Sequence, residues 1–302
     1  MAEISMTHTQ TAAKPQRKRR RPIRFGTVVD HAVLIAGAAL MVVPVLMALM
    51  STSLPDTEIL KNGVQFAVGD QMANNFHKAM VEKSGFTEAI TGARMLTNSM
   101  ILGVGFALGK IAISLIAAYA IVYFRLRFAT LAFWMIFTTL LLPLEVRILP
   151  SYEAIQRLGL TNTYGGLIIP LIASATATFF FRQFFLSVPE ELVEAARIDG
   201  AGPVKFFLDI LVPLSRTMIA AIFIIMFVFG WNQYLWPTMI TTDESMYTLV
   251  RGIRQILAVL EGGTIPEYGK ALALAIVAML PPVAIVVFFQ NWFVKGLTES
   301  DK

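Results

Sequence analysis

The chain has 302 residues, of which 56% are hydrophobic and only 15% are charged, and its formal net charge is +5. Soluble domains carry about 25% charged residues, so this composition indicates a membrane protein. The absence of cysteine excludes disulfides, thiolate metal sites and thiol catalysis. The three histidines (His8, His31 and His77) are far apart and belong to no metal-binding motif, so we expect no metal site.

Basic residues are concentrated near the start of the chain. Seven of the 25 Lys and Arg residues lie between Lys14 and Arg24, directly before the first apolar run. This placement is typical of a cytoplasmic anchor and not of a nucleic-acid-binding surface. The apolar run is longer than the 7–15 residues of a signal-peptide core, which favours an uncleaved first span. We therefore expect a basic cytoplasmic extension over residues 1–27, a transmembrane domain over 28–302, and no nucleic-acid partner.

Six continuous apolar runs are each close to the 20 residues that a helix needs to cross a bilayer. Their approximate bounds are 30–53, 97–123, 128–149, 165–185, 217–238 and 271–293. Because these runs are continuous and do not alternate with polar residues, they exclude a transmembrane β-barrel. The sequence therefore predicts an all-α, polytopic membrane protein with six transmembrane helices.

The distribution of basic residues predicts the orientation, because cytoplasmic loops carry an excess of Lys and Arg. If both termini are cytoplasmic, the inner segments hold most of the Lys and Arg residues. The outer segments near 54–96 and 239–270 are then long and polar, and we expect partly structured surface elements there.

A short acidic segment, Ser187–Gly202, interrupts the apolar sequence on the predicted cytoplasmic side. Ser187 and Glu190 match an S-x-x-E capping box, and Pro189 suits a first helical turn. Gly200 is a typical left-handed helix stop. The predicted helix has about three turns, and its surface includes Leu192, Ala195, Ala196 and Ile198.

A second amphipathic segment follows the acidic one and ends at Pro213. Its apolar residues at helical spacing are Val204, Phe207, Leu208 and Leu211. The pattern alone leaves two interpretations open for the whole insert. It is either a docking element for another protein or an ordinary interfacial helix–turn–helix that links two spans.

The stretch "EAARIDGAGPVKFFLDILVP" resembles the EAA loop of ABC importer permeases. The matching positions are Glu194, Ala195, Ala196, Gly200, Ile210 and Pro213, while Val212 stands where leucine is usual. From about residue 28 onward, further segments resemble permeases of the carbohydrate-uptake (maltose-type) group, and most closely those of sn-glycerol-3-phosphate importers. These segments are "ATLAFWMIFTTLLLPLEVRILPSYEAI", "LIASATATFFFRQFF", "VPEELVEAARIDGA" and "GWNQYLWP".

The resemblance implies an ABC importer permease fold with an EAA loop over 187–216, whose cytoplasmic coupling helix docks on a separate ATPase subunit. The coupling residues that it implies are Glu190, Glu194, Ala195, Ala196, Asp199, Gly200 and Pro213. The implied partners are a second homologous permease, an ATPase homodimer that binds ATP and Mg, a periplasmic substrate-binding protein and the bacterial inner membrane. The implied cargo is sn-glycerol-3-phosphate, with glycerophosphodiesters as possible further substrates. A neutral sugar or oligosaccharide is the alternative cargo, and a secondary transporter or channel is the alternative class.

Charged residues inside spans are costly and are default functional candidates. Lys110 lies near the middle of the second run, where the alternative role is an ion pair with a carboxylate of another span or subunit, or a snorkelling side chain. Near the end of the third run, Glu145 accompanies Arg147, which suits a bidentate phosphate contact or an interfacial anchor. The fifth run ends with candidates for the substrate pathway or an aromatic belt, namely Trp231, Asn232, Gln233, Tyr234 and Trp236. We find no motif of nucleophilic or metal catalysis, so we expect the chain to be no enzyme by itself, with no cofactor of its own.

Overall fold

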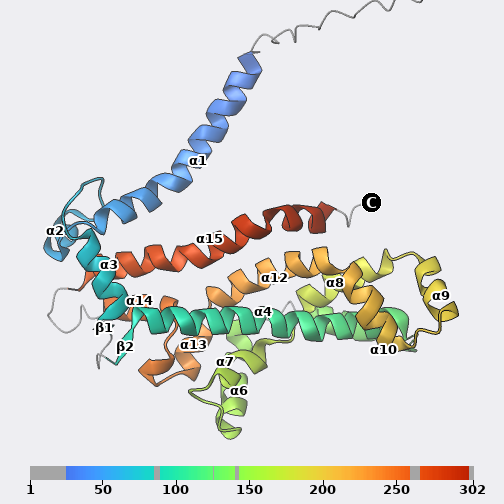
Figure 1. Cartoon of the computed structure of the whole chain (residues 1–302). Helices are drawn as coiled ribbons and strands as arrows, with labels where there is room; N and C mark the ends of the chain where they lie inside the picture. Colours follow the sequence, from blue (N-terminus) through green and yellow to red (C-terminus); the bar gives the residue numbers. More distant parts are fainter. Residues whose placement is uncertain (1–24, 85–88, 125, 140–142, 259–265, 299–302) are drawn as a thin grey trace, which may run out of the picture. The chain divides into compact units, whose positions relative to one another are not determined.

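The computed structural model describes residues 25–84, 89–124, 126–139, 143–258 and 266–298 (Figure 1). The expected basic extension therefore lies almost entirely outside the described residues. The chain divides into two compact units, residues 1–45 and 46–302, and each is described by itself. The first unit contains most of helix α1 (Phe25–Ser51), which is apolar on every side and has exposed Val33, Leu34 and Leu40. A soluble helix hides its apolar stripe, so this surface is typical of a helix that faces lipid.

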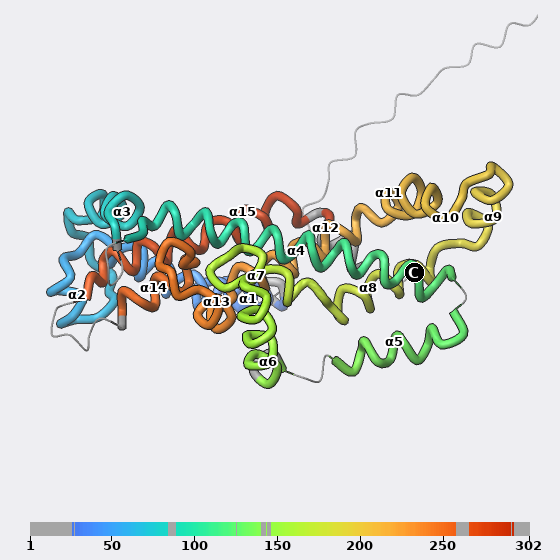
Figure 2. The backbone as a smooth tube through the Cα atoms, turned by 90° about the horizontal axis from the view of Figure 1, so that it is seen from below, coloured from blue at the N-terminus to red at the C-terminus, as the bar shows by residue number. Residues whose placement is uncertain are grey.

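The second unit is organised around one long helix, α4 (Gly92–Tyr123), which runs unbroken for 32 residues. It packs against α8 (Ala175–Leu186) and α12 (Arg216–Trp231), and α12 packs in turn against α15 (Tyr268–Thr298), as Figure 2 shows in a second view. Small residues allow close approach, since a Cβ atom at Gly103 would lie 2.9 Å from the ring of Phe227. The core therefore lies along the length of α4.

Three helices are long and apolar enough to cross a membrane, and there are up to five spans if each bent pair counts as one. In the first bent pair, α7 (Tyr164–Ile168) continues through a 3-10 turn, η2 (Ile169–Leu171), and meets α8 at 51°. In the second pair, residues 203–214 meet α12 at 72°. The described parts of the chain thus contain more breaks than the continuous apolar runs predicted.

The expected third span, 128–149, differs most from its prediction. An apolar helix, α5 (Ala129–Thr138), covers only its first half, and a separate helix, α6 (Leu144–Arg157), begins after Pro143. Proline disfavours a helical conformation at the preceding residue and cannot donate a backbone hydrogen bond. It therefore starts a new helix here instead of continuing the old one.

The two ends of α4 have different surroundings, and we name them the Gly92 end and the Tyr123 end. At the Gly92 end lie α2 (Asp56–Asn62), α3 (Met72–Val81), η4 (Glu244–Met246) and α14 (Leu249–Ala258). Two-residue strands, β1 (Lys83–Ser84) and β2 (Ile90–Thr91), pair antiparallel and are the only departure from an all-helical fold among the described residues. These elements confirm the expected structured segments near 54–96 and 239–270.

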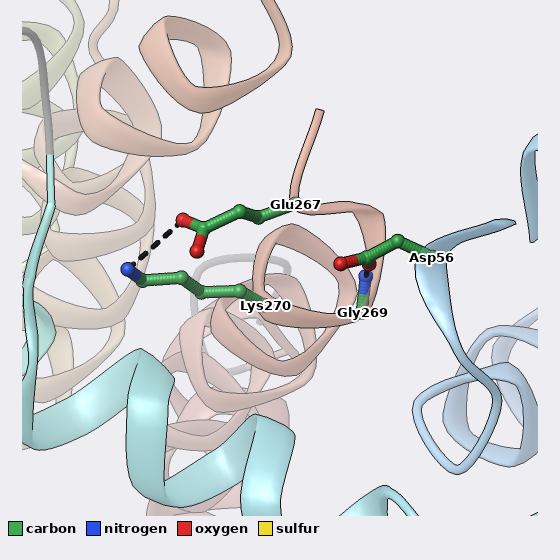
Figure 3. A network of polar contacts seen from close by, with 4 residues as sticks. All are labelled: Asp56, Glu267, Gly269 and Lys270. Carbon is green, nitrogen blue, oxygen red and sulfur yellow. Dashed lines mark hydrogen bonds and ion pairs between the residues drawn. The ribbon is translucent and has the colours of Figure 1, made fainter. Parts of the chain in front are cut away.

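Polar contacts at the Gly92 end fix the start of α15 (Figure 3). The carboxylate of Asp56 accepts a hydrogen bond of 2.7 Å from the backbone N–H of Gly269, in the first turn of α15. In the same turn, the ammonium of Lys270, which is almost fully buried, forms a 3.0 Å ion pair with Glu267. Acidic groups near a helix N-terminus interact favourably with the helix dipole. Helix α2, which follows α1, is therefore held against the start of α15 by this hydrogen bond.

Candidate functional site

The acidic insert lies at the Tyr123 end, where its helix α9 (Glu190–Ile198) has no side-chain cap. The expected capping box of Ser187 and Glu190 is wrong. Ser187 instead ends α8, and its hydroxyl donates a 2.7 Å hydrogen bond to the carbonyl of Phe184. The preceding helix captures this hydroxyl because the carbonyls of its last turn need donors. Pro189 is the residue that precedes α9.

The end of α9 matches its prediction. Gly200 has a φ of 73°, in the left-handed region that glycine adopts without the strain met by most side chains. Its N–H donates to the carbonyl of Arg197 at 3.1 Å, and the N–H of Ala201 donates to that of Ala196 at 2.8 Å. This pair of bonds is a Schellman motif, so the chain reverses sharply after α9.

The two adjacent alanines of α9 face different surroundings. Ala196 is only 4% exposed and belongs to the core of its own chain, together with Tyr119 and Phe206. Ala195 is exposed, as are Glu190, Glu194 and Asp199, and Ile198 is 85% exposed. The surface open to another protein therefore includes Ala195 and the acidic residues but excludes Ala196.

The segment after α9 folds as α10 (Pro203–Lys205), a π-helix, η3 (Phe206–Leu211), and α11 (Val212–Leu214). In this segment, Phe206 and Leu211 are buried, while Val204 and Leu208 are exposed, which corrects the predicted apolar face. A π-helix brings residues five apart onto one face, so the α-helical spacing assigned the wrong side chains. Pro213 is exposed, and the segment ends one residue after it.

A cavity of about 570 Å³ lies beside the middle of α4 and brings three of the predicted pathway residues together. These are Lys110 of α4, Arg147 of α6 and Gln233, which follows α12. The hydroxyl-bearing residues Ser174, Thr176 and Thr178, at the start of α8, also line it. None of the described residues that line this cavity is acidic.

Lys110 is the more firmly held of the two cations. It is 8% exposed, its ammonium donates to the carbonyl of Ala173 at 3.2 Å, and it lies 4.4 Å from the ring centroid of Phe106. The expected alternative, a carboxylate partner, is not found among the described residues of this chain. Arg147, in contrast, is exposed. The backbone of Glu145 lies in α6, but its side chain is outside the described residues.

The predicted pathway residues at the end of α12 other than Gln233 do not line the cavity. The indole N–H groups of two buried side chains donate to backbone carbonyls inside the protein, Trp231 to Ala278 and Trp236 to Leu167, both at 3.1 Å. The side chain of Asn232 donates to a carbonyl of its own helix, and Arg254 lies over the ring of Tyr234. The two tryptophans therefore pack in the core and do not form an aromatic belt.

Several residues of this region escaped the sequence interpretation. The start of α8 reaches the cavity because Ser174 caps that helix, accepting from the N–H of Ala177 at 3.2 Å. The signal was a cluster of small hydroxyl residues, "SATAT", inside an otherwise apolar run. Tyr119 and Tyr123, which bond to residues on either side of the acidic insert, carried no signal, because these partners are more than 60 residues away.

Comparison with known proteins places these features in a family. Residues 110–299, more than half of the chain, match the family described as binding-protein-dependent transport system inner membrane component. The chain is 47% identical over 286 residues to the sn-glycerol-3-phosphate transport system permease protein UgpE of Rhizobium meliloti, covering 94% of this chain and 99% of that protein. It is 46% identical over 276 residues to the protein of the same name from Escherichia coli O1:K1, covering 91% and 97%.

A solved structure supports the same fold. The crystal structure of a bacterial ABC transporter involved in the import of the acidic polysaccharide alginate contains a chain that matches with a TM-score of 0.69. The match covers 89% of this chain and 96% of that chain at 19% identity, which is likeness of fold alone. From the family match and from the identity over nearly the whole length, this chain belongs to the binding-protein-dependent transport system inner membrane components, the permease family of ABC importers.

Proposed function

We propose that this chain is a permease subunit of an ATP-driven importer that carries sn-glycerol-3-phosphate, and glycerophosphodiesters as related substrates, across the bacterial inner membrane. The names of relatives that match nearly end to end at 45–47% identity support this cargo. Both termini and the 187–216 loop then face the cytoplasm, in agreement with the excess of basic residues predicted there. The Gly92 end of α4 faces the periplasm.

The charge of the cavity is the observation that carries the choice of cargo. Lys110 and Arg147 contribute two cations, and no described lining residue contributes an acid. A phosphate forms charge-assisted hydrogen bonds with such groups, and these are about twice as strong as neutral ones. A neutral sugar would leave both cations without a counter-charge in a membrane-embedded cavity, which is costly. The cavity therefore favours an anionic substrate over a neutral oligosaccharide.

The broken span gives the phosphate a third source of positive potential. α8 begins at the cavity, where the chain bends by 51°, so backbone N–H groups of its first turn lie near the substrate. The N-terminus of a helix carries a partial positive charge, and discontinuous membrane helices use such ends to bind anions. In this proposal the position of the Lys110 ammonium is fixed by its hydrogen bond to the carbonyl of Ala173, beside the first turn of α8. The exposed side chain of Arg147 moves to contact the phosphate when it binds.

The exposed face of α9 is the proposed docking surface for a separate ATPase subunit. It presents Glu190, Glu194, Ala195 and Asp199, and Gly200 sets the reversal that leaves this face accessible. The further partners are a second permease subunit, a second ATPase copy and a periplasmic binding protein, with ATP and Mg bound by the ATPase. Uptake that needs only an ion gradient would contradict this assignment and favour a secondary transporter.

The experiment is uptake of labelled sn-glycerol-3-phosphate by the whole importer in proteoliposomes, with the loaded binding protein outside. We expect Lys110→Met to lower uptake at least tenfold, because a hydrogen bond to a charged group contributes about 1.5–3 kcal/mol. Arg147→Met should lower it less, and neither change should prevent assembly with the ATPase. Lys61→Met, which removes an exposed cation in α2, is the matched control. Normal uptake by both cavity variants would contradict the proposed site.

A further inference from the structure

Two tyrosines at the last turns of α4 are hydrogen-bonded to the chain on either side of α9. The hydroxyl of Tyr119 donates to the carbonyl of Pro203 at 2.9 Å, and that of Tyr123 donates to the carbonyl of Phe185 at 3.2 Å. Phe185 lies just before the α9 segment, and Pro203 lies just after it. Both ends of the segment that carries α9 are therefore fixed to the same helix.

The rings of the two tyrosines add contacts to the same segment. The ring centroid of Tyr119 lies 4.8 Å from that of Phe207, and the centroid of Tyr123 lies 5.5 Å from that of Phe206. Both phenylalanines belong to the π-helix η3. Aromatic pairs at these separations stabilise a contact beyond the burial of their surface. η3 thus rests directly on α4.

α4 connects this contact to the cavity. It has no proline and no break between Lys110 and Tyr119, which are nine residues apart. At a rise of 1.5 Å per residue, Lys110 lies about 14 Å from Tyr119 along the helix axis. A continuous helix moves as one body, so a displacement at its end shifts Lys110 as well.

We propose that Tyr119 and Tyr123 are positioning residues that hold the α9 segment on α4, so that a movement of α9 is carried to Lys110 in the cavity. This inference rests on the proposed function, because it assigns a route between the docking surface and the substrate. Without the two hydroxyls, α9 moves with the ATPase subunit on which it docks, but α4 does not move with α9. ATP is then hydrolysed with less substrate moved.

The first experiment measures substrate molecules transported per ATP hydrolysed by the whole importer. We expect Tyr119→Phe and Tyr123→Phe, which keep the rings, each to lower this ratio about threefold, and the double variant about tenfold. Tyr164→Phe is the matched control, since it removes a hydroxyl bonded to Asn98 at 2.7 Å near the Gly92 end. A double variant within twofold of the unmodified importer would overturn the proposal. An equal loss in the control would also overturn it, because the effect would then be general loosening.

A second experiment does not depend on the substrate. Because the chain has no cysteine, spin labels can be placed at Ile198→Cys in α9 and Ile116→Cys in α4, two exposed positions. We expect the distance between the labels to keep one narrow distribution through the ATP cycle, and to broaden in the double tyrosine variant. An unchanged distribution in that variant would overturn the proposal even if the cargo is another molecule. Loss of uptake in the unmodified importer would instead count against the proposed function.

Discussion

The two ends of α4 are held in different ways. At the Gly92 end, Asn98 is fully buried, and its amide donates at 2.9 Å to the carbonyls of both Ser245 and Tyr247. Its own carbonyl accepts from the hydroxyl of Tyr164, and the neighbouring Ser99 accepts from the N–H of Leu249. At the Tyr123 end, the contacts are two tyrosine hydroxyls and a set of aromatic rings beside an exposed helix.

The difference separates a fixed end from one that is able to move. The hydrogen bonds of buried Asn98 favour a single arrangement, because each displaced group would be left unpaired in a low dielectric. The hydroxyl of Thr248, in the same stretch as Tyr247, has no hydrogen-bond partner among the described residues. Ring contacts keep most of their stabilisation through small displacements, since they have no single required geometry. We infer that α4 is anchored at its Gly92 end and turns about this end as one body when its Tyr123 end is displaced.

The largest expected effect comes from breaking the anchored end. Asn98→Ala removes the partner of the buried carbonyl of Tyr247 and of the partly buried carbonyl of Ser245 and hydroxyl of Tyr164, and a buried group left without a partner costs about 1–3 kcal/mol. We expect the free energy of unfolding to fall by about 3 kcal/mol or more, measured by thermal unfolding of the detergent-solubilised importer. Asn74→Ala is the control, because that amide donates to the side chain of Gln71 on the exposed surface. Equal stability of the two variants would show that the Gly92 end is not the anchor.

The next effect separates the two alanines at the Tyr123 end. Ala196→Leu adds apolar volume at a buried position that lines, with Tyr119 and Phe206, a cavity of about 200 Å³, so we expect the leucine to fill part of that space and to raise the stability of this chain by about 2 kcal/mol. Ala195→Leu projects from the exposed face, so it should leave this chain stable and weaken only its association with the ATPase subunit. Thermal unfolding of the isolated permease chains and pull-down of the ATPase separate the two effects. The same thermal stability in both variants would contradict the assignment of the two faces.

The sequence predicted the features that depend on local chemistry. The left-handed stop at Gly200, the long continuous span of α4 and the helical content all follow from residue type and hydrophobic pattern. Charge inside an apolar run also singled out Lys110 and Arg147, which the structure places in one cavity. A charged side chain inside a membrane span is costly whatever its tertiary contacts are, so it can be recognised as a functional candidate from the sequence alone.

The features that could not be predicted from the sequence depend on contacts between residues that are far apart in the chain. Asn98 was not among the predicted functional residues, because the carbonyls that it binds lie almost 150 residues away. Trp231 and Trp236 matched the composition of an aromatic belt, but carbonyls of other helices accept their N–H groups. The buried face of η3 was misassigned because a π-helix has a different period from the α-helix that the spacing assumed.

A smaller effect is expected from the turn that orients α9. Apart from its own chain neighbours, no described residue has an atom within 4 Å of a Cβ added at Gly200, so the left-handed φ is what opposes a side chain there. We expect Gly200→Ala to destabilise the turn by about 1–2 kcal/mol and to lower transport per ATP, with Gly200→Asn milder, because asparagine tolerates this conformation. Gly202→Ala is the control, since Gly202 has an ordinary φ of −69° and equally open space. Equal transport by the Ala variants at 200 and 202 would contradict the role of the turn.

The smallest effect tests whether the two ends act independently. Asp56→Ala removes the carboxylate that caps α15 through the N–H of Gly269, and loss of a helix cap typically costs about 1 kcal/mol. We expect a small drop in thermal stability with unchanged transport per ATP, because this contact lies at the Gly92 end, away from α9. Asp70→Ala is the control, since that carboxylate accepts a hydrogen bond from the amide of Gln71 on the exposed surface. If Asp56→Ala lowered transport per ATP as much as the tyrosine variants, the Gly92 end would also take part in the movement, and α4 would have no fixed end.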